Sequence, residues 1–336
     1  MVRRFISAGL FITIVLFCWP AFAETSFFYK EINLVGGYSN LDKWVDAWDE
    51  QTSSVGFEYF SKFANDYGDF LTANLQVRFA YDSKENSQNA WGVQVHNAWL
   101  RFKLDSINKI KIGHLDVPFA LNQVVDAHST LLQTLAPDDI GFVKDWGGAL
   151  ESSFSKFDTS IALQLGSGMS IYRRDGSFLL SGRIGTPQGS NAQAGISFMY
   201  GKVLDTIGMK TIPRNDLVSN TATLKKRIGL DGQYLFGPLL TKAEIDFGTN
   251  ARTDVRGYFL EMDYTVPKLQ NLELEIQYKN WQNNMHDSSM DDSAVTLGLS
   301  YKLNSKVTIR SSFAAGLNRM GQDEDRVFLL QFYFYG

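Results

Sequence analysis

Strict alternation of apolar and polar residues is the feature of this sequence that most constrains its fold. The segment 269–282 shows it most clearly. Its apolar positions are Leu272, Leu274, Ile276 and Tyr278, and its polar positions are Glu273, Glu275, Gln277 and Lys279. Successive side chains of a strand point to opposite faces. Because an unpaired charge is costly in a dry core and costs about 2–4 kcal/mol in mid-membrane lipid, the pattern predicts a sheet with one apolar face and one face in water.

About sixteen segments of this kind follow one another along the chain. We predict strands at 26–37, 53–64, 69–82, 90–105, 108–119, 146–154, 157–166, 177–186, 191–203, 225–236, 239–249, 255–266, 269–282, 293–303, 305–317 and 325–335. Bacterial single-chain barrels have an even number of strands, and a barrel of about 16 strands leaves an aqueous interior. We therefore expect an all-β fold, a transmembrane antiparallel up-and-down β-barrel of about 16 strands.

The connections between these segments alternate in length. The short ones are 106–107, 155–156, 237–238, 267–268 and 304, with 65–68 and 187–190 slightly longer. The long, polar ones are 38–52, 83–89, 120–145, 167–176, 204–224, 250–254, 283–292 and 318–324. Tight turns on the periplasmic side and longer loops outside are typical of outer-membrane barrels. No linker or change of composition interrupts the series, so we predict one domain.

The first 23 residues have the pattern of a secretory signal peptide. Arg3 and Arg4 precede an apolar run at 5–19, and Ala21-Phe22-Ala23 fits an A-x-A cleavage site. We expect residues 1–23 to be removed and residues 24–336 to form a barrel surrounded by lipid of the cell outer membrane. The one cysteine, Cys18, lies in the removed segment, so the mature chain would have no thiol for a disulfide, a metal site or a nucleophile.

Composition narrows the class of protein further. Without Arg3 and Arg4 the chain has 30 basic against 36 acidic residues, and this acidic surplus argues against nucleic acid as a partner. No second apolar run of 18 or more residues occurs, which argues against a helical membrane protein. Aromatic residues make up 14% of the chain and prolines number only 7. This combination favours an outer-membrane β-barrel.

The segment 119–146 is the longest without alternation between two predicted strands. Loops of this length inside a compact domain are usually functional. Its charged residues are Asp126, His128, Asp138, Asp139, Lys144 and Asp145. Apolar residues such as Leu131, Leu135 and Phe142 lie among them and would hold the loop against a wall. We expect a long inward-folded loop after strand 5.

Two features resemble a known family. The residues Gly113-His114-Leu115-Asp116-Val117-Pro118-Phe119-Ala120 resemble the G-x-x-x-x-P-F-G segment of phosphate-selective porin O/P-like proteins, with Ala120 where Gly is usual. The order of strands, with the longest loop after the fifth, resembles the Gram-negative outer-membrane porin superfamily. The resemblance implies a passive diffusion channel for small hydrophilic solutes and ions, in which loop 119–146 is the constriction, and it implies a homotrimer.

Strand parity nominates charged residues for the inner wall. The candidates are Arg78, Arg101, Lys103, Lys111, Arg183, Arg227 and Arg310. Acidic residues of the loop facing these bases would set up a transverse field across a weakly screened constriction. The alternative is that the bases pair with acids of neighbouring strands. Those acids are Glu244, Asp246, Glu261, Asp263, Glu273 and Glu275.

Other chemistries remain open but are less specific. Asp126-x-His128, His114-x-Asp116 and the acids near His286 have types and spacings that a divalent metal accepts. Such short matches are frequent by chance, so we expect no metal and no cofactor. No G-x-S-x-G elbow occurs, and we expect no catalytic residues and no enzyme activity. A barrel that sheaths or binds a protein partner as a non-conducting scaffold would have a similar sequence. An outer-membrane hydrolase is a further alternative, which the absence of a nucleophile motif disfavours.

Overall fold

The computed structural model describes residues 25–41, 43–45, 47–48, 51–66, 68–81, 90–126, 130–207, 210–212, 216–217, 221–287, 291–319 and 325–336. These residues form almost only β-strands. The expected signal peptide at 1–23 and His128 of the expected constriction loop lie outside the described residues. Within the described ranges, no helix is long and apolar enough to cross a membrane.

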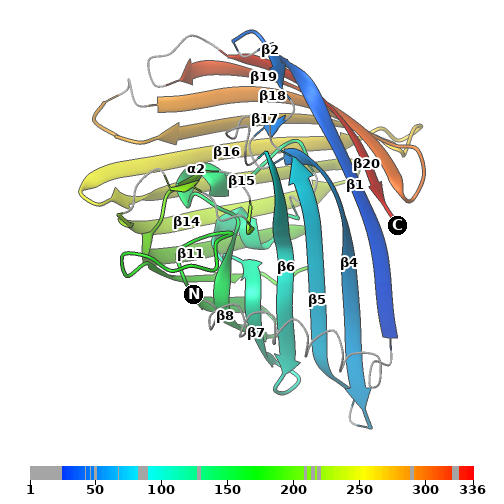
Figure 1. The fold of residues 1–336 in the computed structure, drawn as a ribbon, viewed down its shortest axis with the longest axis vertical. Helices are drawn as coiled ribbons and strands as arrows, with labels where there is room; N and C mark the ends of the chain where they lie inside the picture. Colours follow the sequence, from blue (N-terminus) through cyan, green and yellow to red (C-terminus); the bar gives the residue numbers. More distant parts are fainter. Residues whose placement is uncertain are drawn as a thin grey trace.

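Sixteen long antiparallel strands form a closed barrel (Figure 1). They are β1 (Thr25–Ser39), β4 (Gln51–Asn65), β5 (Gly68–Tyr81), β6 (Trp91–Lys103), β7 (Asn108–Asp116), β8 (Lys144–Ser153), β9 (Asp158–Gln164), β10 (Phe178–Gly185), β11 (Ala192–Val203), β14 (Thr223–Phe236), β15 (Leu239–Asn250), β16 (Thr253–Thr265), β17 (Leu272–Gln282), β18 (Asp291–Lys302), β19 (Val307–Arg319) and β20 (Arg326–Tyr335). The last strand, β20, pairs with β1 from Ser39↔Val327 to Glu31↔Tyr335, which closes the sheet. The predicted antiparallel barrel of about 16 strands is confirmed.

The two faces of the wall carry the two kinds of side chain that the alternation predicts. On β14, Ile228 and Leu230 point outward and are 59% and 51% exposed, whereas Arg227 and Asp231 point inward and are buried. Apolar residues are exposed in the same way on the outside of the other strands, for example Ile196 and Phe332. An outward apolar band of this kind is stable in a bilayer. The polar side chains line the lumen.

The predicted alternation of connections is correct except at residues 250–254. β15 and β16 are joined by a two-residue turn at Ala251 and Arg252, across the pair Asn250↔Thr253. Ala251 has a φ of +54°, the left-handed conformation that tight turns require. The polar residues here belong to strand ends in solvent, where polarity does not distinguish a strand from a loop. Short strands in other loops are β2 (Lys43–Val45), β3 (Ala47–Trp48), β12 (Thr206–Ile207) and β13 (Asp216–Leu217).

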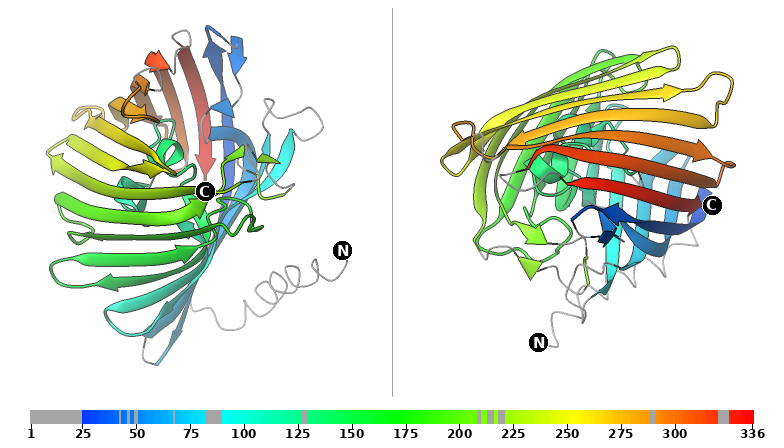
Figure 2. Two further views of the ribbon diagram at one scale, coloured as in Figure 1. Left: turned by 90° about the vertical axis from the view of Figure 1, so that its left-hand side faces the viewer. Right: turned by 90° about the horizontal axis from the view of Figure 1, so that it is seen from above.

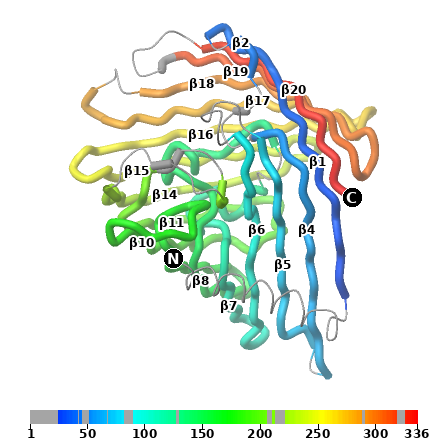
Figure 3. Tube along the Cα trace, in the orientation of Figure 1, coloured from blue at the N-terminus to red at the C-terminus, as the bar shows by residue number. Residues whose placement is uncertain are grey.

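The connection between β7 and β8 folds into the barrel (Figure 2). This segment, residues 117–143, is called the inner loop below. It contains two single turns of helix, η1 (Ala120–Gln123) and α2 (Ala136–Asp139). The expected bounds of 119–146 are corrected at both ends, because β7 ends at Asp116 and β8 begins at Lys144. The Cα trace shows its path within the ring of strands (Figure 3).

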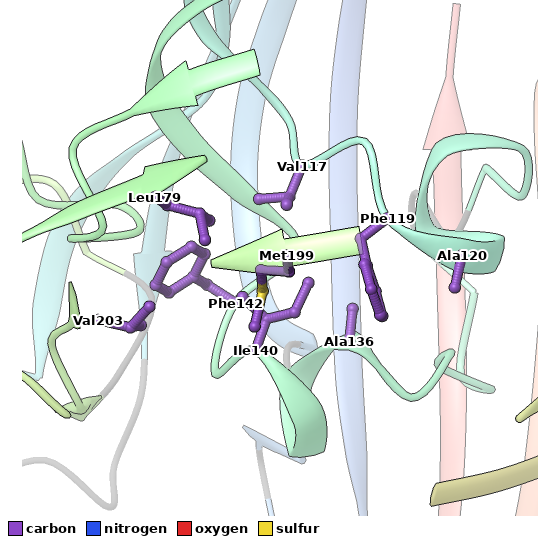
Figure 4. Packing of buried hydrophobic residues seen from close by; sticks show 9 residues of the cluster. All are labelled: Val117, Phe119, Ala120, Ala136, Ile140, Phe142, Leu179, Met199 and Val203. Carbon is purple, nitrogen blue, oxygen red and sulfur yellow. The ribbon is translucent and has the colours of Figure 1, made fainter. Parts of the chain in front are cut away.

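The largest buried apolar cluster lies between the inner loop and the barrel wall (Figure 4). The loop contributes Val117, Phe119, Ala120, Ala136, Ile140 and Phe142, and the wall contributes Leu179, Met199 and Val203 from β10 and β11. Each of these side chains is at most 4% exposed. Burial of apolar surface stabilises by about 25 cal/mol per Å². The hydrophobic effect therefore holds the loop on one side of the lumen.

The first half of β6 is not paired with β7, because β7 ends at Asp116 and the chain then turns into the lumen. β7 pairs with β6 only from Ala98↔His114 to Lys103↔Lys109. Residues 210–212, from the connection between β11 and β14, occupy part of the free edge. The Val93 N–H donates to the carbonyl oxygen of Ile212 (2.6 Å), and the Thr211 N–H donates to the carbonyl oxygen of Val93 (2.8 Å). This pairing covers backbone groups that an open edge would expose.

Candidate functional site

The inner loop leaves the wall at Val117-Pro118-Phe119-Ala120, the end of the segment that resembles the porin motif. Phe119 is 1% exposed and packs in the cluster of Figure 4. Ala120 follows with a φ of +46°, and its N–H donates to Ser197 Oγ on β11 at 2.9 Å. A positive φ is the conformation that favours glycine. Ala120 therefore adopts a backbone conformation that glycine would adopt with less strain.

Polar contacts fix the inner loop to the inner faces of β11, β14, β15 and β17. We call this surface, with its contact residues Ser197, Lys225, Arg227, Glu244 and Lys279, the docking wall. The Leu121 N–H donates to Glu244 Oε2 at 2.9 Å, and Lys225 Nζ donates to the carbonyl oxygen of Ile140 at 2.8 Å. These bonds satisfy backbone groups of the loop that the lumen would otherwise leave without partners.

Two acid–base pairs cross from the inner loop to the docking wall. Asp139 binds the Arg227 guanidinium, and both side chains are fully buried. Asp138 Oδ2 lies 3.2 Å from Lys279 Nζ in a more exposed pair. In these two contacts an acid of the loop faces a base of the wall. Loss of one partner of such a buried pair is costly because it leaves the other charge buried without a counter-charge.

Apolar side chains complete the docking further along the inner loop. Leu121 and Leu135 pack against Phe259 of β16, with Val124 and Val125 at the edge of the cluster. A second group joins the loop to β20 and the first outer loop, and it consists of Leu131, Leu132, Val327, Leu329 and Val45. Almost the whole described loop is thereby attached to one half of the barrel. Asp126, in contrast, is exposed.

Two residues expected in the constriction loop belong to the wall instead. Lys144 and Asp145 begin β8. Lys144 Nζ binds Asp116 of β7. Asp145 accepts hydrogen bonds from the N–H groups of Gly166 (2.5 Å) and Ser167 (3.2 Å), so it fixes the start of the next loop. This strand start shows no apolar alternation because both residues make polar contacts.

The predicted wall cations have different partners. Three are occupied away from the inner loop: Arg78 with Glu31 at 2.7 Å, Arg183 with Asp231 at 2.9 and 2.6 Å, and Arg310 with Gln331 at 3.1 Å. Arg227 binds the loop, as described above. Arg78 and Arg183 thus pair with acids of the wall, as the alternative expected, but the partners are Glu31 and Asp231. Of the acids named for that alternative, Glu261 and Asp263 bind Lys242 at 2.5 and 2.8 Å.

The remaining predicted cations lie together on β6 and β7. Arg101 is directly opposite Lys111, and Lys103 is directly opposite Lys109. We call these four residues the basic patch. Lys109 was absent from the predicted site, although its parity matches that of Lys111. Lys225 and Lys279 were also missed there, because parity identifies an inward side chain but not whether a loop will reach it.

The sequence contains His and acidic residues at spacings that a divalent metal accepts, among them His114 and Asp116. Nowhere in the described ranges do three or more His, Cys, Asp or Glu side chains come together as a metal site. His114 instead packs on the Trp146 ring, with centroids 4.8 Å apart, and its Nδ1 lies 3.0 Å from the carbonyl oxygen of His96. The contacts of His114 are thus with other strand residues of the barrel wall.

Comparisons with known proteins agree with this geometry. No protein-family model matches the chain, and no curated protein matches its sequence. Solved structures match its shape. OmpT with loop L8 deleted, an outer-membrane protein of Vibrio cholerae, is 14% identical with a TM-score of 0.65, over 93% of this chain and 99% of that one. OmpF of Salmonella typhi, in complex with daunomycin, is 11% identical with a TM-score of 0.66, over 93% and 97%.

A third match is the anion-selective porin from Comamonas acidovorans. It is 13% identical with a TM-score of 0.61, over 93% of this chain and 99% of that one. The fold is that of the outer-membrane porins. At these identities the likeness concerns the fold alone. In this barrel the inner loop binds the docking wall, and the basic patch lies on other strands.

Proposed function

We propose that this protein is an outer-membrane porin, a passive diffusion channel for small hydrophilic solutes and ions in which the inner loop is the constriction. One observation carries the proposal. The loop is attached to the docking wall and narrows the lumen from that side, while charged side chains on β6 and β7 face the remaining space. A lumen lined by charges is wet, and its narrowest charged ring sets selectivity.

Liposome swelling tests the channel directly. Folded protein in liposomes is expected to admit a pentose rapidly and a trisaccharide slowly, and planar bilayers are expected to show stepwise conductance. Heat-unfolded protein is the control. Protein that keeps the heat-modifiable mobility of a folded barrel but passes neither sugars nor ions would contradict the proposal and favour the non-conducting scaffold.

The role of the loop acids has its own test. Asp138 pairs with Lys279 at the lumen side of the docking wall, so Asp138→Asn is expected to shift the reversal potential under a salt gradient toward anion preference. Asp287→Asn, in an outer connection, is the matched control because it removes the same charge outside the lumen. Equal reversal potentials for the two variants would remove Asp138 from the constriction.

Placement in the cell outer membrane, removal of residues 1–23, enclosure by lipid and a homotrimer belong to the same proposal. The outward apolar band supports contact with lipid. The OmpT structure of Vibrio cholerae described as a trimer form shares the fold, at 14% identity and a TM-score of 0.63. Cross-linking of unheated protein from outer membranes is expected to give a trimer band, and a monomer at all cross-linker concentrations would contradict it. We propose no enzyme activity, metal or cofactor.

A further inference from the structure

A cavity of about 250 Å³ lies between the inner loop and the end of the barrel that has the short turns. Gln123 of η1 lines it from the side of the loop, and Gln188 lines it from the turn between β10 and β11. Short side chains of the wall, Ala149 of β8 and Ser160 of β9, also line it. In the proposed channel, a solute that has passed the inner loop from outside would come past this cavity.

The cavity is lined by as many acids as bases. The three cations are Arg101, Lys109 and Lys111 of the basic patch, and the three acids are Asp116, Glu151 and Asp158. At neutral pH these charges cancel. A simple anion is attracted by half of the groups and repelled by the other half, and the same holds for a simple cation. The lining therefore favours a solute that carries both charges and has no net charge.

One side of the cavity has a cation that lacks an acid partner. Asp116 binds Lys144 and lies 3.9 Å from Lys111 Nζ, so these three charges neutralise one another. Around Arg101, in contrast, no described carboxylate lies within 4.0 Å of the guanidinium, whose carbon is 5.6 Å from the Trp99 ring centroid. The N–H groups of Arg101 are therefore available to a solute in the cavity.

The opposite charges of Lys109 and Glu151 are close together but do not form an ion pair. The two residues are directly opposite each other in the pairing of β7 with β8, and Cβ atoms of such residues are about 4.5–5.5 Å apart. Their charged groups nevertheless lie more than 4.0 Å apart, and no described residue donates a hydrogen bond to Glu151. Asp158, in contrast, accepts the Gln188 N–H at 3.0 Å. Lys109 and Glu151 therefore leave a gap that a small dipolar molecule can bridge.

We propose that this cavity is a binding subsite for small zwitterionic solutes of the α-amino acid class. The inference rests on the proposed channel and names a class of solute for it. The carboxylate of the solute accepts charge-assisted hydrogen bonds from Arg101 and Lys109, and its ammonium group donates to Glu151. An apolar cavity of about 150 Å³ holds benzene. Alanine has as many non-hydrogen atoms as benzene, so the cavity is large enough for it.

Saturation-transfer NMR on the purified, detergent-solubilised protein tests the subsite without requiring conductance. The probes at neutral pH are alanine, propionate, ethylamine and ribose. Propionate lacks the ammonium group of alanine, ethylamine lacks its carboxylate, and ribose has hydroxyls but no charge. Alanine is expected to have a dissociation constant several-fold lower than each of the other three, because it alone forms charge-assisted bonds on both sides. Alanine binding no tighter than that of the other probes would overturn the proposal.

Two substitutions should change the order of the probes in opposite directions. Glu151→Gln is expected to weaken alanine several-fold and to strengthen propionate, because the carboxylate that attracts an ammonium group repels an anion. Arg101→Gln is expected to weaken alanine several-fold and to strengthen ethylamine for the converse reason. A structural defect would weaken all probes together. Equal weakening of all probes in both variants would therefore contradict the proposal.

The matched control is Glu273→Gln. Glu273 lies on the inner face of β17, on the same side of the strand as the buried Gln277, and does not line the cavity. The variant removes the same charge from another part of the lumen, so its alanine affinity should equal that of the wild type. An equal loss in Glu273→Gln and Glu151→Gln would overturn the proposal. Heat-modifiable mobility on gels verifies that each variant is folded.

Bilayer recordings separate failure of this inference from failure of the proposed function. A protein that conducts but binds alanine no more tightly than propionate and ethylamine would be a channel without this subsite. A protein that binds alanine with the expected dependence on Arg101 and Glu151 but does not conduct would have the subsite without the channel.

Discussion

The docking wall and the basic patch consist of the same alternating strands, yet they use their charges in opposite ways. On the docking wall, Arg227 is buried against Asp139 and Glu244 accepts the Leu121 N–H, so each of these groups has a partner from the inner loop. On the basic patch, Arg101 and Lys111 lie opposite each other and face the lumen. Charges of the first kind hold the structure, and under the proposed function charges of the second kind face the solutes that pass.

This difference shows that strand alternation decides only which face is wet. What a wet face does depends on whether a loop covers it. The inner loop brings its own apolar cluster and its own acids to the docking wall, so that surface becomes part of the protein interior. Substitutions on the docking wall should therefore change stability, and substitutions on the basic patch should change selectivity.

Arg227→Gln is expected to have the largest effect. It leaves the Asp139 carboxylate buried without its guanidinium, and breaking a buried pair in this way costs about 3–5 kcal/mol. Hydrogen exchange of the described loop amides at 130–143 should rise, and single-channel current should become noisy. The double variant Arg227→Gln with Asp139→Asn should recover part of the loss. Unchanged exchange in the single variant would show that the pair does not hold the loop.

Leu135→Ala tests the apolar part of the same contact. Leu135 is fully buried against Leu121 and Phe259, and a truncation of this kind costs about 2–5 kcal/mol. Loop amides should exchange faster, whereas Leu230→Ala, on the outer face, should leave them unchanged. If both variants exchange like the wild type, apolar packing does not decide where the loop lies.

Lys103→Gln with Lys109→Gln should give the opposite result on the basic patch. Removal of two like charges from opposing positions should change the free energy of unfolding by no more than about 0.5 kcal/mol. The reversal potential in a salt gradient should move toward cation preference. A large loss of stability without a change in reversal potential would mean that the patch is structural and would abolish the contrast with the docking wall.

Asp105→Asn should have the smallest effect. Asp105 lies in the turn between β6 and β7, where its carboxylate accepts hydrogen bonds from Asn108 Nδ2 (2.9 Å) and from the N–H groups of Asn108 and Ile107 (both 2.7 Å). These bonds, the Asn108 side chain first, lower the pKa of the Asp105 carboxyl. Because the folded pKa is below the unfolded one, the contribution to stability is present above about pH 4 and is lost as the pH falls through the folded pKa.

The measurement for this variant is a pair of unfolding midpoints at pH 7 and pH 3. The wild type should lose more stability on acidification than Asp105→Asn, which keeps the acceptor but not the charge. An equal loss in both proteins would show that the turn does not depend on the ionised carboxylate.

The sequence was sufficient for the strands because each inward or outward position is decided locally. The predicted order of Leu274 and Ile276 outside, with Glu275 and Gln277 inside, is found in β17. Arg227 and Asp139 were both predicted for the site, but their pairing was not. They are 88 residues apart in the sequence. Strand alternation shows which face of the barrel a side chain is on, but not which loop residue will contact it.

Strand boundaries were predicted least well where polar side chains bind backbone groups or other side chains at the start of a strand. Lys144 and Asp145 looked like loop residues because two adjacent polar residues break the alternation, although they begin β8. Trp99 was not predicted as part of any site, since an inward tryptophan has no distinct pattern in a chain with 14% aromatic residues. Its ring lies beside Arg101 and Lys111, two cations that only the pairing of β6 with β7 brings together.

The early departure of the chain into the lumen has a consequence for assembly. Thr211, which bonds to Val95 of β6, lies 116 residues further along the chain. If the barrel forms in the order of its sequence, the seam beside β6 stays unfinished until the segment after β11 has arrived. Insertion machinery or a chaperone would then encounter unpaired backbone groups on β6 until residues 210–212 bind there. Variants at residues 210–212 should therefore slow folding of the barrel more than they reduce the stability of the folded barrel.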